Sequence, residues 1–555
     1  MVKDVFTVIV GGKAGEGVKK SGSIASALFT KMGRHIFQRD DYMSLIQGGH
    51  NYSVVSTANR PISSQYSNTE LIINSDERSY NKHKRKLVDN GILIFNSDSQ
   101  EDVEGIGVPF SSKAKNYKNK KLMYGVGAFA VLVSVIGQPK SELKKIIKDQ
   151  FPENSWEDNI SYAEDIYEFV DPKVSGKFKL KGGDKKRPIL TGNESLSLGA
   201  LAAGLESYYA YPMTPASSIL HFLAKYQEKF NLSVSQPENE IAVINMAIGS
   251  SFSGAKTMIA SSGGGYALMG EGYSLAGMTE TPLLIVLSSR PAPASGVPTY
   301  TEQGDLQFAL NTGHGDFLRI VASPSSIEEA YYLAAELMAL TWKFQTPATL
   351  LTSKHLSESH MTVDLDINKA KWPEPKIFEG DGEYKRYLKT DDGISPLMFP
   401  PKDELIKWNS YEHDELGITT EKAEIISNMH DKRHRKVETM KKFMKSMKTV
   451  NVYGEGDPLI FTWGSTTMSV LEALEYGDIQ ATVVQPIYLR PFPVWAIKEY
   501  QNKEIISIEL NRSGQFTQLL REKANLNIKE LINQYNARPF DPINLSNQIK
   551  EAIKK

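Results

Sequence analysis

The chain has 555 residues, more than a single hydrophobic core usually supports, so several domains are expected. Its 64 Lys and Arg residues balance 65 Asp and Glu residues, which gives no reason to expect a polyanionic partner such as nucleic acid. The absence of cysteine excludes disulfides, thiolate nucleophiles and any iron–sulfur cluster or Cys-ligated zinc held by this chain alone.

The longest apolar run, from about Leu122 to Ile136, is shorter than the roughly 20 residues that a membrane-spanning helix needs. The first residues, MVKDVFTVIVGG, lack the apolar core and the small-residue cleavage site of a signal peptide. We therefore expect a soluble cytoplasmic protein without membrane contact. If electrons pass through this protein, another subunit has to carry them.

The first unit, residues 1–175, alternates strands and helices. The β-branched run VFTVIV (5–10) leads into GGKAGEG (11–17), and the apolar spacing of SGSIASALFTKM (21–32) is helical, so we predict a strand, a glycine turn and a helix. Further strands and helices are predicted at 71–75, 91–97, 121–137 and 140–151. This alternation favours an α/β layer.

The glycine turn could bind an anion, because a helix start presents free backbone N–H groups. It does not fit a P-loop, since Lys19 comes one place too late after Gly17. It does not fit a dinucleotide fingerprint either, since Lys20 stands where a third glycine is needed. A structural turn, an anion or cofactor-phosphate site and a Rossmann NAD site all stay open at this point.

The rest of the chain is predicted to contain two more α/β units and a connection. A Gly- and Lys-rich stretch between Val174 and Arg187 has no apolar period and indicates a linker. Residues 188–360 alternate buried strands with helices of small residues, and 451–555 begin a last α/β unit at PLIFTWGS. The connection, 361–450, is Pro-rich and then charged. We interpret its end as a solvated amphipathic helix rather than a nucleic-acid or membrane surface, with an apolar face formed by Val437, Met440, Met444 and Met447.

The stretch YYAYPMTPASSI (208–219) predicts a rigid turn that carries a hydroxyl group. Thr214 followed by Pro215 is typical of an N-cap and a first helical residue, so a helix is expected over SSILHFLAKYQ. Free N–H groups and the helix dipole would favour a carboxylate at this position. The hydroxyl of Thr214 could accept a capping bond and donate to an anionic ligand, although capping alone is the simpler interpretation.

Two carboxylates, Glu238 and Glu240, stand just ahead of a helix of small and apolar residues. Close packing of that helix could draw Glu240 into a partly buried setting, where a carboxyl group can share a proton. A solvated charge in the first helical turn is the alternative.

No metal site is predicted in this chain. Gly380 to Gly382, followed by Asn409, approximates the magnesium motif of thiamine diphosphate enzymes, but no apolar strand precedes it and FPPK interrupts it. His314 and Asp316 in GHGD do not have metal-ligand spacing, so a hydrogen-bonded loop histidine is expected.

Taken in order, these motifs resemble the alpha subunits of archaeal-type 2-oxoacid:ferredoxin oxidoreductases whose gamma domain is fused at the N-terminus. YPMTP, the helix begun by Glu240 and PTYTEQGDL form the most specific combination. The other segments that carry the resemblance are GGKAGEGVKKSG, YMSLIQGGHN, TGNESLSLGALAAG, MTETPLLIV, GHGD, DDGISP, RPFP and ELNRSGQF.

The resemblance implies a multidomain α/β fold. A gamma-like domain would occupy 1–175, a thiamine-pyrimidine-binding domain 188–360, the connection 361–450, and an α/β domain like the last domain of transketolases 451–555. It also implies coenzyme A-dependent oxidative decarboxylation of a 2-oxoacid (pyruvate, 2-oxobutyrate or 2-oxoglutarate) to acyl-CoA and carbon dioxide, with electrons passed to ferredoxin.

The resemblance implies partners too. Thiamine diphosphate would be shared with a beta subunit that holds the diphosphate, the magnesium ion and an iron–sulfur cluster, and the complex would be a dimer of alpha–beta heterodimers. Coenzyme A would be a co-substrate. Aryl or branched-chain 2-oxoacids as substrates, or a non-catalytic organising subunit, are the alternatives. An independent NAD dehydrogenase would need a glycine fingerprint that this chain lacks.

Site residues follow from the matching motif positions. Glu240 would hydrogen-bond the aminopyrimidine ring of the cofactor and drive formation of the reactive C2 carbanion. Thr214 would contact the carboxylate end of the 2-oxoacid. The remaining residues of the YPMTP motif would shape the turn beside the cofactor, namely Tyr211, Pro212, Met213 and Pro215.

The sequence also departs from the family pattern. Tyr300 stands near the place where many relatives carry a basic residue that pairs with the substrate carboxylate. A tyrosine can donate one hydrogen bond but brings no charge, so pyruvate or a broader range is favoured over 2-oxoglutarate. Gln47 replaces an arginine in SLIQGGH, and RPAPASG (290–296) replaces RGGPSTG, which puts anion contacts through these segments in doubt.

Overall fold

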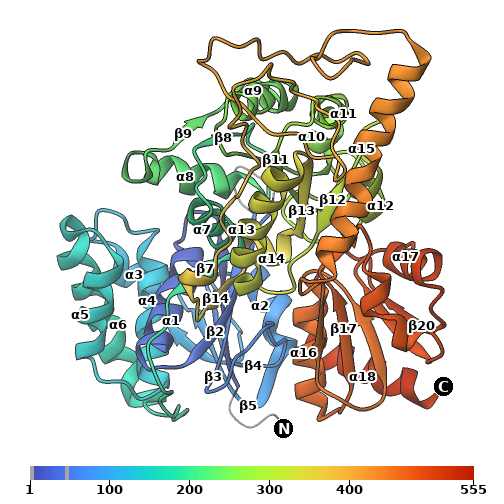
Figure 1. The fold of residues 1–555 in the computed structure, drawn as a ribbon. Coiled ribbons are helices and arrows are strands. Elements are labelled where there is room, and N and C mark those ends of the chain that lie inside the picture. The colour runs from blue at the N-terminus through green and yellow to red at the C-terminus, as the bar shows by residue number, and fades with distance from the viewer. Residues whose placement is uncertain (1–4, 44–48) are drawn as a thin grey trace.

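The computed structural model describes residues 5–43 and 49–555, and these residues form three β-sheets flanked by helices (Figure 1). The first and third sheets lie side by side, and the domain built on the second sheet lies above both. The predicted α/β layers are therefore confirmed.

The first sheet has the order β6-β5-β4-β1-β3-β2-β14-β7. Its strands are β1 (Phe6–Lys13), β2 (His35–Asp41), β3 (His50–Ala58), β4 (Thr69–Asn74), β5 (Leu87–Asn96), β6 (Ile106–Val108), β7 (Ile189–Thr191) and β14 (His360–Thr362). Its helices are α1 (Val18–Lys31), α2 (Glu77–His83), α3 (Phe110–Ala114), α4 (Met123–Val135), α5 (Ser141–Gln150) and α6 (Trp156–Val174). Every residue of α4 is buried, so the longest apolar run of the chain is a core helix.

The second sheet has the order β18-β12-β13-β11-β10-β8-β9. All its pairs are parallel except the one between β12 and β18. Its strands are β8 (Ser207–Tyr209), β9 (Ser233–Ser235), β10 (Thr257–Ser261), β11 (Leu283–Ser289), β12 (Ile320–Ala322), β13 (Pro347–Ser353) and β18 (Tyr488–Arg490). Its helices are α7 (Gly192–Ala202), α8 (Ser217–Phe230), α9 (Glu240–Phe252), α10 (Gly263–Leu268), α11 (Gly270–Met278), α12 (Leu306–Asn311), α13 (Ile327–Phe344) and α14 (Lys354–Glu358).

The third sheet has the order β15-β17-β16-β19-β20 and is parallel except for β15. Its strands are β15 (Val450–Tyr453), β16 (Leu459–Thr462), β17 (Thr482–Pro486), β19 (Ile505–Glu509) and β20 (Ile528–Asn533). Its helices are α16 (Thr466–Gly477), α17 (Gln515–Ala524) and α18 (Pro542–Lys554). Short 3-10 helices are η1 (Lys84–Lys86), η2 (Glu153–Ser155), η3 (Ile367–Lys369), η4 (Val494–Ala496) and η5 (Lys498–Tyr500).

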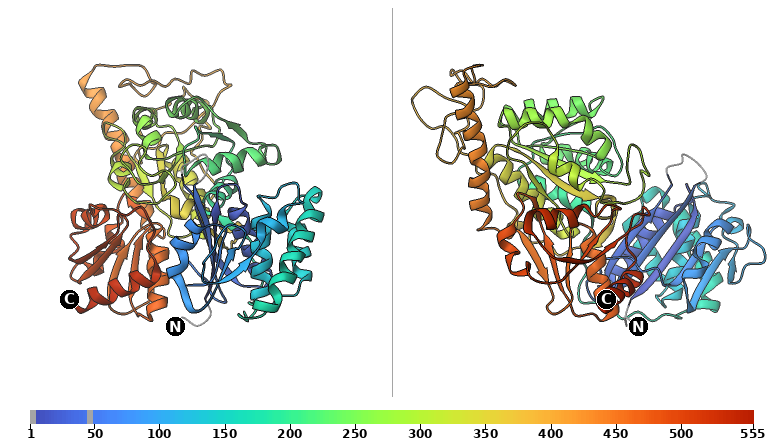
Figure 2. Two further views of the ribbon diagram at one scale, coloured as in Figure 1. Left: turned by 180° about the vertical axis from the view of Figure 1, so that it is seen from behind. Right: turned by 90° about the vertical axis from the view of Figure 1, so that its right-hand side faces the viewer.

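The connection contains one long helix, α15 (Ala423–Met444), which runs beside the second domain toward the third sheet (Figures 1 and 2). Met440 and Met444, from the apolar face expected of an amphipathic helix here, are buried. The expectation that its charged residues are solvated is wrong for Lys432 and Lys436, which are also buried. Both lysines form ion pairs with Glu280, a buried residue at the end of α11, and the contact between Lys432 Nζ and Glu280 Oε1 is 2.6 Å. The buried carboxylate explains why two charged residues face the core.

The sheets do not coincide with the expected domain boundaries. Strands β7 and β14 lie at the two ends of the 188–360 segment, yet both extend the first sheet. Strand β18 comes from the 451–555 segment and extends the second sheet. The division into 1–175, 188–360, 361–450 and 451–555 therefore stays a prediction.

Within residues 5–43 and 49–555, no helix combines the length and the apolar character needed to cross a membrane.

Candidate functional site

Four neighbouring parallel strands of the second sheet, β11, β10, β8 and β9, end at the same edge of the sheet. Their carboxyl ends are followed by RPAPASG, SGGGY, AYPMTP and QPENE. In open α/β sheets, ligands bind in the crevice outside the carboxyl ends of the strands. The topology therefore brings the predicted turn and the predicted glutamate to one place with the RPAPASG segment and with SGGGY, a segment that was not predicted.

Glu240 is the first residue of α9, and its side chain points into the protein. Asn239 caps the helix by accepting the backbone N–H of Ala242 at 3.0 Å, which leaves the next side chain free to turn inward. Glu240 is 2% exposed, and its Oε1 accepts a hydrogen bond from the hydroxyl of Ser261 at 3.2 Å. No other hydrogen bond to this carboxylate occurs among the described residues. Of the two alternatives left open for Glu240, the structure shows the buried one, whereas Glu238 is exposed.

Small residues make room for this carboxylate. A Cβ atom at Gly265 would lie 2.1 Å from Glu240 Oε1 and 2.1 Å from Ser261 Oγ, so the position accepts only glycine unless the site shifts. The neighbouring Ser262 hydroxyl is buried and finds no hydrogen-bond partner in the described part of the chain. A buried polar group without a partner is costly, so this hydroxyl is a candidate contact for a ligand.

The YPMTP turn meets the glutamate at Ser261. Met213 Sδ lies 3.8 Å from Ser261 Oγ, so this hydroxyl contacts both predicted elements. Tyr211 and Pro212 are exposed, and Pro215 is buried. The turn therefore presents its first two residues outward and anchors its last one in the core.

Thr214 does not cap the helix, and that prediction is wrong. Helix α8 begins at Ser217, its N-cap is Ala216, and no side-chain cap bond forms. A backbone turn comes first, in which the N–H of Ala216 donates to Met213 O at 2.9 Å. Because this turn separates Thr214 from the helix, its half-buried hydroxyl makes no hydrogen bond to any other described residue. The hydroxyl is therefore available to a ligand.

Arg290 was not predicted as a site residue. It directly follows β11, and its Nη1 donates to the backbone carbonyl of Thr214 at 2.7 Å. Burial lowers the pKa of Arg290, and the nearby Asp305 opposes this effect. Asp305 is itself buried and accepts a hydrogen bond from Ser289 at 2.8 Å, and burial raises the pKa of its carboxyl group. An arginine at the end of a buried strand was the available sequence signal.

Tyr300 forms no hydrogen bond or ion pair with Glu240 or with the 211–215 turn among the described residues. Its ring is covered by Arg538, at 3.6 Å from the guanidinium carbon to the ring centroid. Burial and the nearby Asp41 raise the pKa of Tyr300. It therefore stands between the first and third sheets. Gln47 lies outside the described residues.

In the glycine turn that follows β1, the carboxylate of Glu16 accepts hydrogen bonds from nearby residues. Glu16 Oε2 accepts the backbone N–H of Lys13 at 2.8 Å and the hydroxyl of Ser75 at 2.5 Å. This internal acceptor uses groups that an anion would need, which supports the structural-turn interpretation. The second glycine motif, near Gly380, has no strand before it, and Asn409 donates its side-chain N–H to Gly417 O at 2.6 Å.

Comparison with known proteins identifies the family. The model of the thiamine diphosphate-binding part of pyruvate flavodoxin/ferredoxin oxidoreductases matches residues 198–432, and that of pyruvate ferredoxin/flavodoxin oxidoreductases matches residues 7–169. The chain is 30% identical to the 2-oxoglutarate synthase subunit KorA of Archaeoglobus fulgidus, over 59% of this chain and 88% of that subunit. The chain belongs to the alpha subunits of the 2-oxoacid:ferredoxin oxidoreductases. The resemblance found in the sequence is thus confirmed.

Other relatives of this alpha subunit match along its whole length. The 2-oxoacid:ferredoxin oxidoreductase subunit alpha of a Sulfolobus species is 28% identical, over 99% of this chain and 96% of the relative. The solved 2-oxoglutarate:ferredoxin oxidoreductase from Magnetococcus marinus, with 2-oxoglutarate, coenzyme A and succinyl-CoA bound, has a TM-score of 0.90 at 28% identity and covers 99% of this chain and 100% of that one. The multidomain α/β fold class, with a gamma-like part and a thiamine-binding part, is therefore confirmed for this alpha subunit.

Proposed function

We propose that this alpha subunit catalyses, together with a beta subunit, the coenzyme A-dependent oxidative decarboxylation of a 2-oxoacid, with ferredoxin as electron acceptor. The observation that carries the proposal is the convergence of a buried carboxylate, an unbonded hydroxyl and a guanidinium group on one edge of the second sheet. These groups belong to Glu240, Thr214 and Arg290.

The residues around Glu240 fit the aminopyrimidine part of thiamine diphosphate. They offer a carboxylate with one oxygen unbonded within the described residues, the orphaned hydroxyl of Ser262, and open space beside Gly264, where an added Cβ would have no heavy atom within 4 Å. When bound, thiamine diphosphate supplies the nucleophilic carbon and the electron sink of the reaction. Glu240 would hold or release a proton at the ring nitrogen that it contacts, a role that contributes ~10²- to 10⁴-fold in such reactions.

The carboxylate end of the substrate would bind at the 211–215 turn. Thr214 donates its hydroxyl hydrogen, because no other described group uses it. Arg290 would not bind the substrate directly but would position Thr214 through the hydrogen bond to its backbone carbonyl. Its positive charge would also attract the substrate carboxylate. Tyr211 and Pro212 would pack beside the cofactor, and Met213 and Pro215 would hold the turn in place.

Pyruvate, 2-oxobutyrate and 2-oxoglutarate are the proposed substrates. The uncharged Tyr300 favours the two short monocarboxylates, while the guanidinium of Arg538 above its ring returns a positive charge to that region. The solved Magnetococcus marinus enzyme has 2-oxoglutarate bound, so 2-oxoglutarate belongs in the substrate panel.

The proposed partners follow from what this chain lacks and exposes. Without cysteine it cannot bind an iron–sulfur cluster, so a beta subunit would carry the cluster, the magnesium ion and the diphosphate end of the cofactor. The outer side of α9 and α10 exposes large apolar side chains near Glu240, which suits a subunit contact. These side chains are Ile241, Met246 and Leu268. A dimer of alpha–beta heterodimers and coenzyme A as co-substrate complete the proposal.

The test is reconstitution of the complex with the co-purifying partner, followed by ferredoxin reduction with a panel of 2-oxoacids. The expected result is coenzyme A-dependent reduction with pyruvate and 2-oxobutyrate, and a loss of about 10²-fold or more in kcat for Glu240→Gln. Glu238→Gln is the matched control, because Glu238 is exposed two residues away. Full activity of an assembled Glu240→Gln complex would reject the catalytic role. Activity restricted to aryl or branched-chain 2-oxoacids would reject the substrate proposal, and assembly without any activity would indicate an organising subunit.

A further inference from the structure

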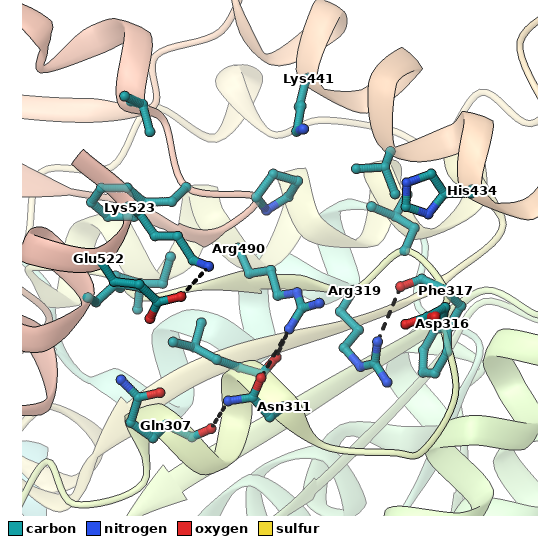
Figure 3. A pocket seen from close by; sticks show the side chains of 18 residues that line it. Gln307, Asn311, Asp316, Phe317, Arg319, His434, Lys441, Arg490, Glu522 and Lys523 are labelled. Carbon is teal, nitrogen blue, oxygen red and sulfur yellow. Dashed lines mark hydrogen bonds and ion pairs between the residues drawn. The ribbon is translucent and has the colours of Figure 1, made fainter. Parts of the chain in front are cut away.

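A cavity of about 500 Å³ lies where the second sheet, α15 and the third-sheet domain meet (Figure 3). Its floor comes from the GHGD segment and the RPFP turn, and its sides come from α15 and α17. Neither Glu240 nor the 211–215 turn lines it. The residues proposed above to bind the cofactor ring and the 2-oxoacid therefore do not contribute to this space.

Arg319 stands on the floor of the cavity and is held rigidly. It is 5% exposed and makes no ion pair with any described carboxylate. Instead, its guanidinium donates only to backbone carbonyl groups, those of Thr312, Gly313, Gly315 and Phe317. The guanidinium also lies against the ring of Phe317, 3.8 Å from its centroid. Four carbonyls and a ring fix its orientation but leave its charge without a counter-ion.

Arg490 lies next to Arg319 and, like it, has no carboxylate counter-ion among the described residues (Figure 3). Its Nη1 donates to the carbonyl of Leu310 and to Asn311 Oδ1, at the C-terminal end of α12. Its Nε and Nη2 find no hydrogen-bond acceptor in the described part of the chain, and no described carboxylate pairs with it. Three N–H groups of this side chain therefore remain available.

The surroundings do not neutralise these two charges. Burial and the adjacent Arg490 lower the pKa of Arg319, which reflects the cost of placing like charges together, and Asp316 offsets this in part. Of the other carboxylates at the cavity, Glu522 is already paired with Lys523 at 2.7 Å. Arg319 is buried and Arg490 is half-buried. A buried cation without a counter-ion is costly, so its persistence beside a second guanidinium points to an anion that is missing from the chain itself.

We propose that this cavity binds an organic phosphate, with the phosphate group between Arg319 and Arg490. Guanidinium groups match the geometry of phosphate oxygens and can bind them through two parallel N–H bonds, which Nε and Nη2 of Arg490 can supply. Arg319 adds its positive charge and the one N–H of Nη1 that no carbonyl accepts. A volume of about 500 Å³ exceeds what inorganic phosphate needs and is within the range of small-molecule sites. The remaining wall is apolar and suits the organic part, with side chains from Leu310, Phe317, Val437, Phe492 and Leu519.

AMP and inorganic phosphate are suitable probes, titrated calorimetrically into the full-length chain alone and in complex with its partner. AMP is expected to bind saturably and more tightly than inorganic phosphate. Arg490→Gln should weaken AMP binding by at least about tenfold, since it removes a charged hydrogen-bond donor. Arg521→Gln is the matched control, because Arg521 lies on α17 outside the cavity, and it should change binding less than about twofold.

A second variant tests the proposal independently in case Arg490→Gln misfolds. His434→Glu changes an exposed residue of α15, leaves both arginines intact and places a carboxylate at the cavity. It should weaken AMP binding to a similar extent by repulsion. The proposal is overturned if AMP does not bind, if both variants bind AMP like Arg521→Gln, or if inorganic phosphate binds as tightly as AMP. Loss of AMP binding when the partner is added would instead assign the arginine pair to a contact between subunits and would also overturn it.

Discussion

The hydroxyl of Ser261 donates to Glu240 Oε1 at 3.2 Å and so joins the end of β10 to the first turn of α9. This bond fixes one oxygen of the buried carboxylate and leaves the other without a hydrogen bond to any described residue. The orientation of Glu240 therefore depends on close approach of the 261–265 backbone, and the first prediction tests that dependence.

Gly265→Ala is expected to reduce kcat of the reconstituted enzyme by about 10²-fold, because the added Cβ would displace the Glu240 carboxylate and small displacements at a reacting group are costly. Gly264→Ala is the matched control on the same helix, since a Cβ there has no heavy atom within 4 Å. Steady-state rates with ferredoxin, after circular dichroism has established folding, measure the effect. Equal rates for the two variants would show that the packing around Glu240 does not matter.

Thr214→Val removes the free hydroxyl at nearly constant volume and is expected to raise KM for the 2-oxoacid by about tenfold, the value of one hydrogen bond to a charged group. Thr214→Ser keeps the hydroxyl and should restore KM to within about threefold. Initial rates over a range of substrate concentrations separate the effects on KM and kcat. A Thr214→Ser variant as impaired as Thr214→Val would assign the effect to the methyl group instead.

The buried charges at α15 predict an asymmetry in stability. Burial raises the pKa of the Glu280 carboxyl, but Lys432 and Lys436 lower it by a larger amount, so the net shift is downward. Burial lowers the pKa of Lys432 to about 7. Glu280→Gln leaves buried cations without an anion and should cost about 3 kcal/mol or more in the free energy of unfolding. Lys432→Met leaves the pair between Glu280 and Lys436 and should cost less than half as much. Thermal unfolding compares the two, and a larger loss for Lys432→Met would contradict this account.

Glu70 predicts a pH dependence of stability. It accepts the backbone N–H of Thr7 at 2.7 Å, and burial raises the pKa of its carboxyl from 4.5 to about 7. Because the folded state binds this proton more tightly, the stabilisation is complete below pH 4.5 and is lost as the pH rises through 7. Glu70→Gln resembles the protonated form and should exceed the wild type in stability at pH 8 by about 1–3 kcal/mol but match it at pH 5.

Melting temperatures from pH 5 to pH 8 measure this difference. The exposed Glu101 provides the control, and Glu101→Gln should follow the wild type across the range. A constant difference between Glu70→Gln and the wild type at every pH would show that proton binding at Glu70 does not contribute.

Local sequence patterns predicted part of this fold well. The glycine turn between a strand and a helix and the apolar run that became α4 depend on neighbouring residues and were found, whereas the sequence left open whether Glu240 is buried or solvated. Strand β2 was missed, because its charged residues do not alternate with apolar ones in a strand pattern; Asp40 is nevertheless buried and accepts a hydrogen bond from Ser53 at 2.7 Å. That partner lies on another strand and leaves no local signal.

Local sequence patterns also fail to predict the contacts in the candidate site that join residues far apart in the sequence. The contact between Arg290 and Thr214 joins positions 76 residues apart, and the hydroxyl of Thr214 is free only because a backbone turn delays the start of α8. The burial of Lys432 depends on Glu280, 152 residues away in the sequence. A motif can identify which residues matter, but the sheet topology decides which of them meet.

Strand β18 belongs to the C-terminal part of the chain but pairs with the second sheet, where it lies antiparallel to β12 and covers its outer edge. A protein shortened before this strand would expose an unprotected row of backbone donors and acceptors, a surface prone to uncontrolled association. Engineering that aims to split this polypeptide into separate modules should therefore cut on the far side of Arg490, or supply a substitute strand.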